Sequence, residues 1–305
     1  MSITSSIANS VLARFGVRLV RANSLERPSV EAPWAKHDLD LYADFYDARS
    51  IRERRFYNIG AGGWAHPAWT NVDNPSDWYE TAQGQGGIGL SWDLLALRPL
   101  DLEPECAELV YTSHVVEHIT DEADENLFRE AHRILKPGGA FRILCPDIGE
   151  ALAALQRNDR HWFNWIARYS RPDEMKRTHI DMPVREAELE QVFLYLVAGS
   201  VSELHADGAA RRFSSEEVRE AFATIPMEEA LDSFCSQCPL DTQKKYPGNH
   251  INWFTTEKLI RMLTAAGFSS VYPSAYGKSR VPVMRNVLYF DYRRPTASIY
   301  VEAIK

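Results

Sequence analysis

Short apolar runs rich in β-forming residues recur between residues 56 and 145, and each ends in a small or polar residue. Runs of this length, too short for regular helices, are typical of buried strands in an α/β sheet. The sequence therefore predicts one sheet core from about Arg55 to Asp147. The runs are Phe56–Ile59, Trp69–Asp73, the segment that ends at Trp92-Asp93-Leu94, Glu108–Ser113 and Ala140–Cys145.

The clearest helical pattern lies before the last of these runs. Apolar residues at helical spacing, with acids crowded into the first turn, predict a helix from Asp121 to Lys136. The run Lys136-Pro137-Gly138-Gly139 is expected to end this helix and to turn the chain into strand 140–145. The predicted apolar face consists of Leu127, Phe128, Ala131, Ile134 and Leu135.

Residues 148–245 differ from the sheet core, because they show helical patterns and few strand signals. Ser214-Ser215-Glu216-Glu217 has the form of a capping box that begins one of these helices. The segment is too long for a plain loop, so we expect a helical insertion. The predicted organisation is a lead-in of residues 1–50, a core made of residues 51–147 and 246–305, and an insertion of residues 148–245.

The core pattern resumes after the insertion. A helix is expected to begin near Thr255 and to end at Gly267, a residue that suits the position after a helix. Three strand-like runs follow this helix: Ser270–Tyr272, Val287–Tyr292 and Ser298–Ile304.

Composition narrows the class of protein. The chain has 305 residues, of which 45% are hydrophobic and 25% charged, as expected for a globular protein with a full core. The net charge of −8 argues against a broad nucleic-acid-binding surface. No apolar run approaches the length of a membrane span. Segment Ile3–Val20 has apolar residues at helical spacing with several arginines. We expect a helix packed on the domain, with a membrane-surface helix or a transit-like leader as alternatives.

The cysteines indicate the redox environment. Four cysteines are too few for a disulfide scaffold in a chain of this length, and a reducing cytoplasm fits best. Cys235-Ser-Gln-Cys238 has the spacing of half a zinc site, but a second ligand pair at matching spacing is absent. We interpret this spacing as coincidence.

The glycine loop Gly60-Ala61-Gly62-Gly63-Trp64-Ala65 follows the first predicted strand and satisfies the dinucleotide fingerprint G-x-G-x-x-G/A. A dinucleotide site needs a full helix after the glycines and an acid about 20 residues further on. Here Asp73 follows Gly60 by 73 − 60 = 13 residues, and His66-Pro67 would break a helix early. The spacing disfavours a nicotinamide oxidoreductase.

In their order, these motifs resemble class I S-adenosylmethionine-dependent methyltransferases. The stretch from Gly60 to Asp73 resembles a subgroup with a shortened crossover between the first two strands, a subgroup often linked to glycan modification. The resemblance implies a Rossmann-like, seven-stranded, mostly parallel sheet with an antiparallel last strand, S-adenosyl-L-methionine as donor and S-adenosyl-L-homocysteine as product. It implies that the donor is bound by Asn58, Gly60, Ala61, Gly62, Gly63, Asp73, Asn74, Asp93, Leu94, Ser113 and His114.

Two acids have specific roles in this resemblance. Asp73 would accept hydrogen bonds from both ribose hydroxyls of the donor, because two carboxylate oxygens match a vicinal diol. Asp93 would hold the adenine. A turn residue before Asn74-Pro75 is the structural alternative for Asp73, and a helix cap before Leu94 is the alternative for Asp93.

His114-Val115-Val116-Glu117-His118 matches the inverted zinc-peptidase motif H-x-x-E-H. That motif requires a long helix and a distal third ligand. Here His114 directly follows a predicted strand, so the two histidines straddle a strand-to-helix turn. The run also resembles the signature after the fourth strand of the methyltransferases. We therefore expect no stoichiometric zinc; a divalent metal at the active site has no acidic pair to support it.

Three residues are candidates for the general base. The end of the fourth strand lies beside the transferring methyl group in this fold, which favours His114. Asp147 follows the fifth strand, and His250 lies where the insertion rejoins the core. Two of the three have a structural alternative: His114 could brace the donor loop, and His250 could cap the helix near Thr255.

We expect methylation of an oxygen, because no Asn/Asp-Pro-Pro-Tyr motif typical of amine methylation follows the fourth strand. The insertion would act as an acceptor lid whose Trp, Tyr, Arg and Asp residues suit a sugar or glycan. Arg168 and Arg171 belong to a group of lid arginines that would favour an anionic acceptor if they converge. A small natural product is the alternative acceptor, and a catalytically silent donor-binding partner protein is the alternative function. The sequence does not indicate an oligomeric state.

Overall fold

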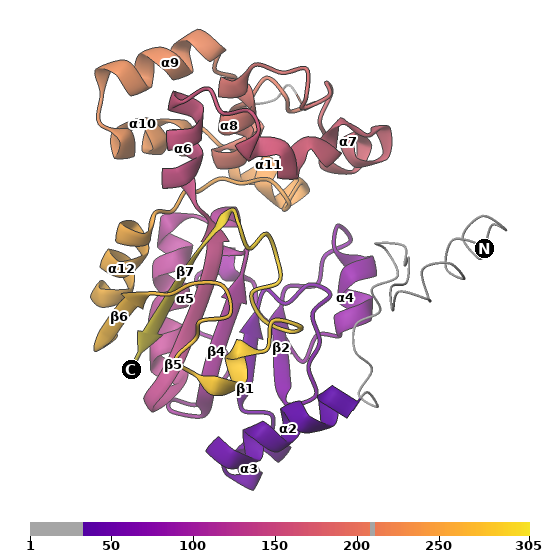
Figure 1. Cartoon of the computed structure of the whole chain (residues 1–305), viewed down its shortest axis with the longest axis vertical. Coiled ribbons are helices and arrows are strands. Elements are labelled where there is room, and N and C mark those ends of the chain that lie inside the picture. Colours follow the sequence, from indigo (N-terminus) through magenta and orange to yellow (C-terminus); the bar gives the residue numbers. More distant parts are fainter. Residues whose placement is uncertain (1–32, 208–210) are drawn as a thin grey trace, which may run out of the picture.

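In the computed structural model, described for residues 33–207 and 211–305, a seven-stranded sheet lies below a layer of helices (Figure 1). The helix expected within Ile3–Val20 lies outside the described residues. The strands are β1 (Phe56–Ile59), β2 (Trp69–Asp73), β3 (Leu90–Ser91), β4 (Ala107–Ser113), β5 (Leu135–Pro146), β6 (Ser270–Pro273) and β7 (Ser298–Ile304).

The strand order is β3-β2-β1-β4-β5-β7-β6. The first five strands along the chain pair in parallel, whereas β7 runs antiparallel to both β5 and β6. This topology confirms the predicted fold class, including the antiparallel last strand. The order reverses direction beside β1, and the crevice at such a switch point is where open α/β sheets bind ligands.

One face of the sheet is covered by α5 (Asp121–Ile134) and α12 (Thr256–Ala265). Thr120 caps α5 by accepting the N–H of Ala123, and three acids in the first turn complement the helix dipole. The predicted apolar face of α5 is fully buried against the strands. Helix α12 ends before Gly267, whose φ of +103° confirms the predicted stop.

The opposite face is covered without a crossover helix. Residues 60–68 connect β1 to β2 without forming a helix, which confirms the shortened crossover. Aromatic side chains fill the space instead, together with α2 (Pro33–Phe45) and the segment around the short 3-10 helix η7 (Pro282–Arg285). Trp64 donates its indole N–H to the carbonyl oxygen of Tyr289 at 2.6 Å, so this layer joins segments that are far apart in the sequence.

Two sequence expectations differ from the structure. Residues 287–292 do not form a strand: Asp291 has a φ of +61°, and its carboxylate pairs with buried Arg142 on β5. The apolar pattern of this run reflects burial of Tyr289 and Phe290 in the aromatic layer. The second difference concerns Lys136–Gly139, which belongs to β5 rather than to a turn, because β5 begins at Leu135 immediately after α5.

The Arg142 guanidinium is fully buried and bridges two carboxylates. It contacts Asp291 at 2.5 Å and Glu302 on β7 at 3.0 Å. The same group donates to Ser274 Oγ at 2.9 Å and to the carbonyl oxygen of Ala275 at 3.0 Å. One side chain of β5 therefore fastens the chain after β6, the irregular segment before β7, and β7 itself.

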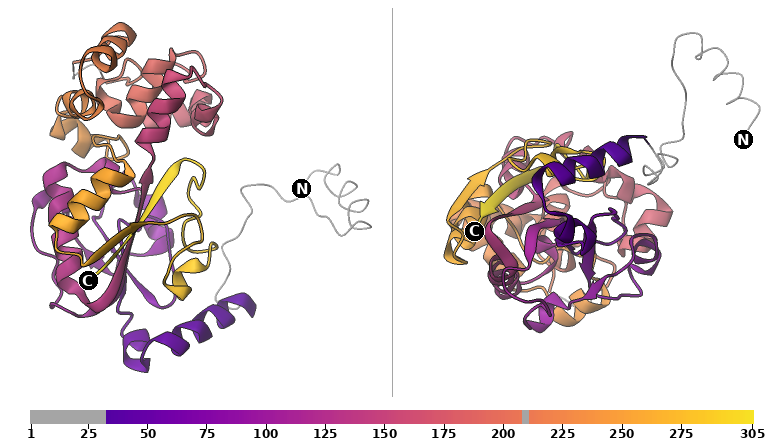
Figure 2. Two further views of the ribbon diagram at one scale, coloured as in Figure 1. Left: turned by 60° about the vertical axis from the view of Figure 1, so that its left-hand side comes forward. Right: turned by 90° about the horizontal axis from the view of Figure 1, so that it is seen from below.

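The insertion is built from helices with a hydrophobic core of their own. Ser214 and Glu217 form the predicted capping box at the start of α9. In Figures 1 and 2 these helices form a separate layer beyond the carboxyl ends of the parallel strands. Its helices are α6 (Ile148–Gln156), α7 (Pro172–Thr178), α8 (Leu189–Val197), α9 (Ser215–Thr224), α10 (Met227–Cys235) and α11 (Leu240–Lys245), with 3-10 helices η5 (Trp162–Ser170) and η6 (Gly199–Val201).

The remaining short elements are α3 (Ala48–Arg52), α4 (Glu80–Gly86), η3 (Leu94–Ala96) and η4 (Val116–His118). Within the described ranges, helices are either too short or too polar to cross a membrane.

Replacement of Arg142 by Met should lower the free energy of unfolding by about 3–5 kcal/mol, because two buried carboxylates lose their cation. Chemical denaturation measures the loss. Replacement of Arg129 by Met, which breaks the exposed pair with Glu125, is the matched control and should change stability far less. Equal effects of the two substitutions would contradict the role assigned to Arg142.

His66 predicts a pH dependence of stability. It is buried, its Nε2 lies 2.7 Å from Asp38 Oδ2, and its Nδ1 accepts the N–H of Ala68. Burial lowers its pKa in the folded protein. The unfolded chain therefore binds a proton near the ordinary pKa of about 6.5 that the folded chain does not. The free energy of unfolding should fall as the pH drops through about 6.5. Between pH 7.5 and 5.5, the fall measured by urea denaturation should be smaller for His66→Asn than for the parent. An equal fall in the two proteins would contradict this prediction.

Candidate active site

A cavity of about 810 Å³ lies where the carboxyl ends of β1, β2 and β4 meet the insertion. Its walls come from the strand ends, from the segment before α4, from η4, and from parts of the insertion and the C-terminal segment. A cavity of this size is typical of small-molecule sites. All eleven residues predicted to bind the donor line it: Asn58, Gly60, Ala61, Gly62, Gly63, Asp73, Asn74, Asp93, Leu94, Ser113 and His114.

The glycine loop begins at Gly60, where the backbone requires glycine for two reasons. Its φ is +68°, a conformation that L side chains rarely adopt. A Cβ at this position would also lie 2.2 Å from Cγ2 of Val115. The loop can therefore approach the turn after β4 closely, and this narrows the cavity between the two strand ends.

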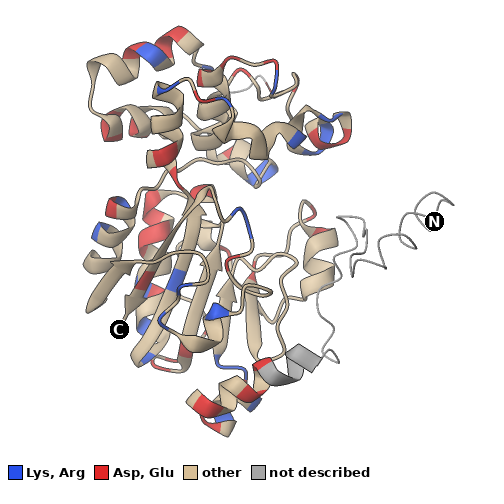
Figure 3. Ribbon diagram, in the orientation of Figure 1, with Lys and Arg blue, Asp and Glu red and all other residues tan. Residues whose placement is uncertain are grey.

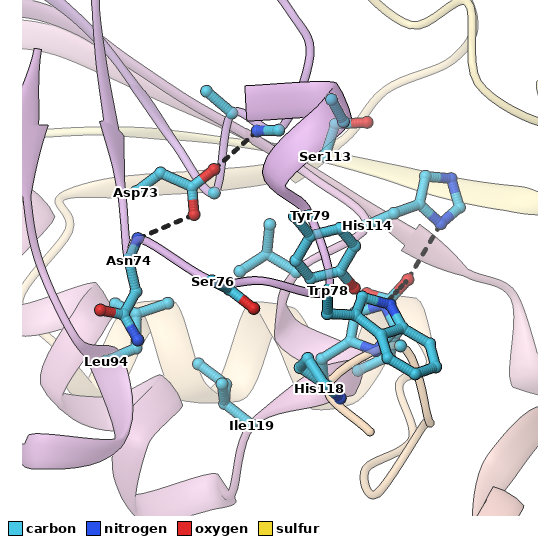
Figure 4. A pocket seen from close by; sticks show the side chains of 18 of the residues that line it. Asp73, Asn74, Ser76, Trp78, Tyr79, Leu94, Ser113, His114, His118 and Ile119 are labelled. Carbon is cyan, nitrogen blue, oxygen red and sulfur yellow. Dashed lines mark hydrogen bonds and ion pairs between the residues drawn. The ribbon is translucent and has the colours of Figure 1, made fainter. Parts of the chain in front are cut away.

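Asp73 at the end of β2 holds the loop in place. Its Oδ2 accepts the N–H of Gly62 at 2.7 Å, and its Oδ1 accepts the N–H of Asn74 at 2.8 Å (Figure 4). Burial raises the pKa of Asp73, and the backbone N–H groups oppose this effect. Each carboxylate oxygen retains a second lone pair for a ligand. Asp73 thus belongs both to the loop and to the cavity wall.

Asp93 both caps a short helix and lines the cavity. Its Oδ1 caps η3 by accepting the N–H of Leu95 at 3.0 Å, as the helix-cap alternative anticipated. The same residue lines the cavity beside Leu94. Capping leaves the second carboxylate oxygen uncommitted, so the two interpretations are compatible.

His114 is held from both sides of its ring. Its Nδ1 lies 3.0 Å from Glu117 Oε1, and its Nε2 lies 3.1 Å from Ser298 Oγ. The backbone at His114 has a φ of +58°, which is uncommon for a residue with a side chain. Both ring nitrogens are engaged within the protein, so this geometry favours the bracing role over proton transfer to an acceptor.

Of the other two candidate bases, only His250 lines the cavity. Asp147 does not line the cavity; its Oδ1 caps α6 by accepting the N–H of Glu150 at 2.9 Å. His250 does line the cavity. Burial lowers its pKa to about 3. A histidine with such a low proton affinity is a weak general base at neutral pH.

The sequence analysis missed an important part of the cavity wall. His118 was interpreted as a structural residue and Glu117 was given no role, yet both line the cavity together with His250. Arg293 and Arg294 were not considered, because they follow the run interpreted as a strand. The sequence did contain a signal, because the H-x-x-E-H run and the adjacent Arg293 and Arg294 were recognisable. Only the fold brings these two segments to the same cavity.

Several arginines line the cavity on the side of the insertion and the C-terminal segment. Arg168, Arg293 and Arg294 make no ion pair with a carboxylate within 4 Å in the described part of the chain, whereas Arg177 pairs with Glu174. Burial lowers the pKa of Arg294. Arg171 lies outside the cavity and is exposed beside Glu174, so Arg168 and Arg171 do not converge on the cavity. Figure 3 shows Lys or Arg residues (blue) on a loop beside the upper end of the sheet, below the insertion.

Residues 70–143 match the sequence model of a family described as "Methyltransferase domain". The matched segment runs from β2 through most of β5 and includes Asp73, Asp93 and His114. This match supports an S-adenosylmethionine-dependent methyltransferase. No curated protein matches the chain.

Solved structures with a related fold include three methyltransferases. A methyltransferase from Mesorhizobium loti has 15% identity and a TM-score of 0.38, with 88% of this chain and 100% of that chain covered. A methyltransferase from Archaeoglobus fulgidus has 12% identity and a TM-score of 0.38, with 93% of this chain and 100% of that chain covered. The methyltransferase SibL has 13% identity and a TM-score of 0.35, and this chain covers 55% of its length. Similarities of this size give no basis for transferring an activity.

Replacement of Asp73 by Asn should weaken binding of S-adenosylhomocysteine by about 10- to 100-fold, because the ribose loses one charged acceptor oxygen, a contact worth about 1.5–3 kcal/mol. Titration calorimetry and the ligand-induced shift in melting temperature measure the loss. Asp77→Asn, at an exposed position nearby, is the control. Parental affinity in Asp73→Asn would refute the role of Asp73 in donor binding.

Proposed function

We propose that this protein transfers the methyl group of S-adenosylmethionine to an oxygen of an anionic sugar or glycan. The observation that carries the donor assignment is Asp73. Its carboxylate lies at the end of β2, faces the cavity and is tied to the glycine loop of β1. A carboxylate and backbone N–H groups at a topological switch point suit a nucleoside with a charged tail.

Each part of the cavity has a role in this assignment. Asp73 binds the ribose hydroxyls, the glycine loop packs against the amino-acid tail, and Asp93 with Leu94 borders the adenine. Ser113 and His114 flank the sulfonium at the end of β4. The acceptor hydroxyl oxygen would attack the methyl carbon in line as the carbon–sulfur bond breaks and its electron pair returns to sulfur, and the hydroxyl proton would pass to water.

The arginines support an anionic acceptor. Arg168 from η5 lies on one side of the cavity, and Arg293 and Arg294 lie on the C-terminal segment. Arginines without a carboxylate partner within the described ranges are available for forked hydrogen bonds to a carboxylate or phosphate. Trp78 and Tyr169 add aromatic surface to the same wall, as is common where ligands are oriented by a few polar groups.

The cysteines support a cytoplasmic location. All four are unpaired: Cys106, Cys145, Cys235 and Cys238. Persistently free thiols fit a reducing compartment.

Turnover tests the reaction itself. The full chain, supplied with S-adenosylmethionine labelled in the methyl group, should transfer label to uronic-acid-bearing or phosphate-bearing oligosaccharides and form S-adenosylhomocysteine. Neutral oligosaccharides of the same length should be poor acceptors. Donor binding without transfer to any glycan in such a panel would contradict the acceptor assignment and leave the donor assignment standing.

The double substitution Arg168→Ala, Arg293→Ala should raise the acceptor KM by about 10-fold or more, since each lost charge-assisted contact is worth about 1.5–3 kcal/mol. The affinity for S-adenosylhomocysteine should not change. Arg171→Ala is the matched control, because Arg171 lies outside the cavity. An unchanged KM on an anionic acceptor, measured across a range of salt, would leave these arginines without a role in binding.

A further inference from the structure

Three side chains with metal-ligand chemistry lie together on one wall of the cavity. Glu117 and His118 come from η4, and His250 comes from the segment that rejoins the core after the insertion. One ligand atom from each lies within 4.8 Å of the other two. We call these residues the Glu117–His118–His250 cluster. In the part of the chain that the structure describes, no other group of three such side chains comes this close.

The two imidazole rings are held with one nitrogen directed at a backbone carbonyl. His118 Nδ1 lies 2.8 Å from the carbonyl oxygen of Asn249, and His250 Nδ1 bonds to the carbonyl oxygen of Leu196. A carbonyl only accepts, so Nδ1 carries the proton in both rings. The lone pair of each neutral ring is then on Nε2, and no described residue hydrogen-bonds to either Nε2. This arrangement is typical of histidines that bind metals, where the second nitrogen donates to a carbonyl.

The Glu117 carboxylate supplies the charge and has an unused oxygen. Glu117 is 1% exposed, and its Oε1 accepts a hydrogen bond from His114. Its Oε2 is buried and has no hydrogen-bond partner among the described residues. A buried carboxylate oxygen without a partner is costly, and a cation would satisfy it.

The backbone fixes the cluster before any ligand arrives. The carbonyl oxygen of Glu117 accepts the N–H groups of Ile251 at 2.9 Å and Asn252 at 3.2 Å, which ties the segment of His250 directly to η4. The carbonyl oxygen of His250 accepts the N–H of Gly199 in the insertion at 2.9 Å. The three side chains are therefore held on one framework, although residues 119–249 separate them in the chain.

We propose that the Glu117–His118–His250 cluster binds one divalent transition-metal ion, with Zn²⁺ as the first candidate. Two imidazoles and one carboxylate form the His₂Glu set of catalytic zinc sites, which leaves a fourth position open. That position faces the cavity. Imidazole nitrogens select Zn²⁺ and similar ions over Mg²⁺ and Ca²⁺, which prefer oxygen ligands. Tetrahedral Zn²⁺ with bonds of about 2.1 Å places its ligand atoms about 3.4 Å apart, and His118 Nε2 lies 3.8 Å from Glu117 Oε1.

This ligand set differs from the one considered from the sequence. The peptidase motif would use His114 and His118 on one helix, and that comparison led to the expectation of no zinc. In the structure, His114 is turned toward Ser298 and donates to Glu117, so it orients a ligand instead of being one. His250 takes the vacant ligand position from the far side of the insertion. Metal binding here does not depend on the proposed methyl transfer.

Metal titration of the tag-free full chain tests the proposal. After removal of metals with a chelator, the parent should bind one Zn²⁺ per chain in calorimetry. Co²⁺ should bind at the same site and give visible absorption bands of a four- or five-coordinate ion. Bound Zn²⁺ should also raise the melting temperature. His118→Gln and His250→Gln should each weaken Zn²⁺ binding at least 100-fold, and Glu117→Gln should do so as well.

His132→Gln is the matched control, because His132 lies on α5 and does not line the cavity. It should bind Zn²⁺ as the parent does. Circular dichroism, measured on every sample, shows that each variant is folded, and a separate measurement of S-adenosylhomocysteine binding keeps this proposal distinct from the proposed function. A parent that binds S-adenosylhomocysteine but takes up no Zn²⁺ or Co²⁺ would overturn the metal site alone. Parental Zn²⁺ affinity in both folded histidine variants would overturn it as well.

Discussion

The short connection between β1 and β2 is the constraint on which the rest of this structure depends. Residues 60–68 leave no room for a crossover helix, so the face of the sheet that such a helix would cover must be buried in another way. Aromatic side chains, α2 and the segment before β7 cover it. That segment is in turn fixed by Arg142, whose burial is stabilised by two carboxylates. The short connection after β1 thus leaves a face of the sheet that the segment before β7, more than two hundred residues further along the chain, helps to cover.

The two sides of the cavity have different origins. The side proposed to bind the donor consists of strand ends and the loops directly after them, positions that parallel pairing brings to one edge of the sheet. The acceptor side consists of the insertion, η4 and the C-terminal segment, which carry the arginines and the Glu117–His118–His250 cluster. Backbone N–H groups and carboxylates dominate the first side, whereas cationic and metal-binding side chains dominate the second. This separation suits a reaction between two different molecules.

The sequence predicted the sheet and the residues at the carboxyl ends of its strands that line the cavity, because both depend on local signals. The spacing from Gly60 to Asp73 excluded a long crossover, and the strand-like runs placed Asp93 and Ser113 at one edge. The acceptor side depends on contacts between distant segments, which periodicity cannot reveal. His118 and His250 meet only because the backbone of Glu117 bonds to Ile251 and Asn252. Residues 287–292 were mistaken for a strand, because burial in an irregular segment and burial in a strand give the same apolar pattern.

The chain changes layers within a single peptide bond at the end of the insertion. Trp253 is buried in the core of the insertion, and the next residue, Phe254, is buried in the core of the sheet. Lys258 on α12 approaches both rings, at 4.2 Å and 5.0 Å from their centroids. A swinging motion of the insertion would have to pull one of these aromatic rings out of its core. The end of the insertion is therefore anchored both in its own core and in the core of the sheet.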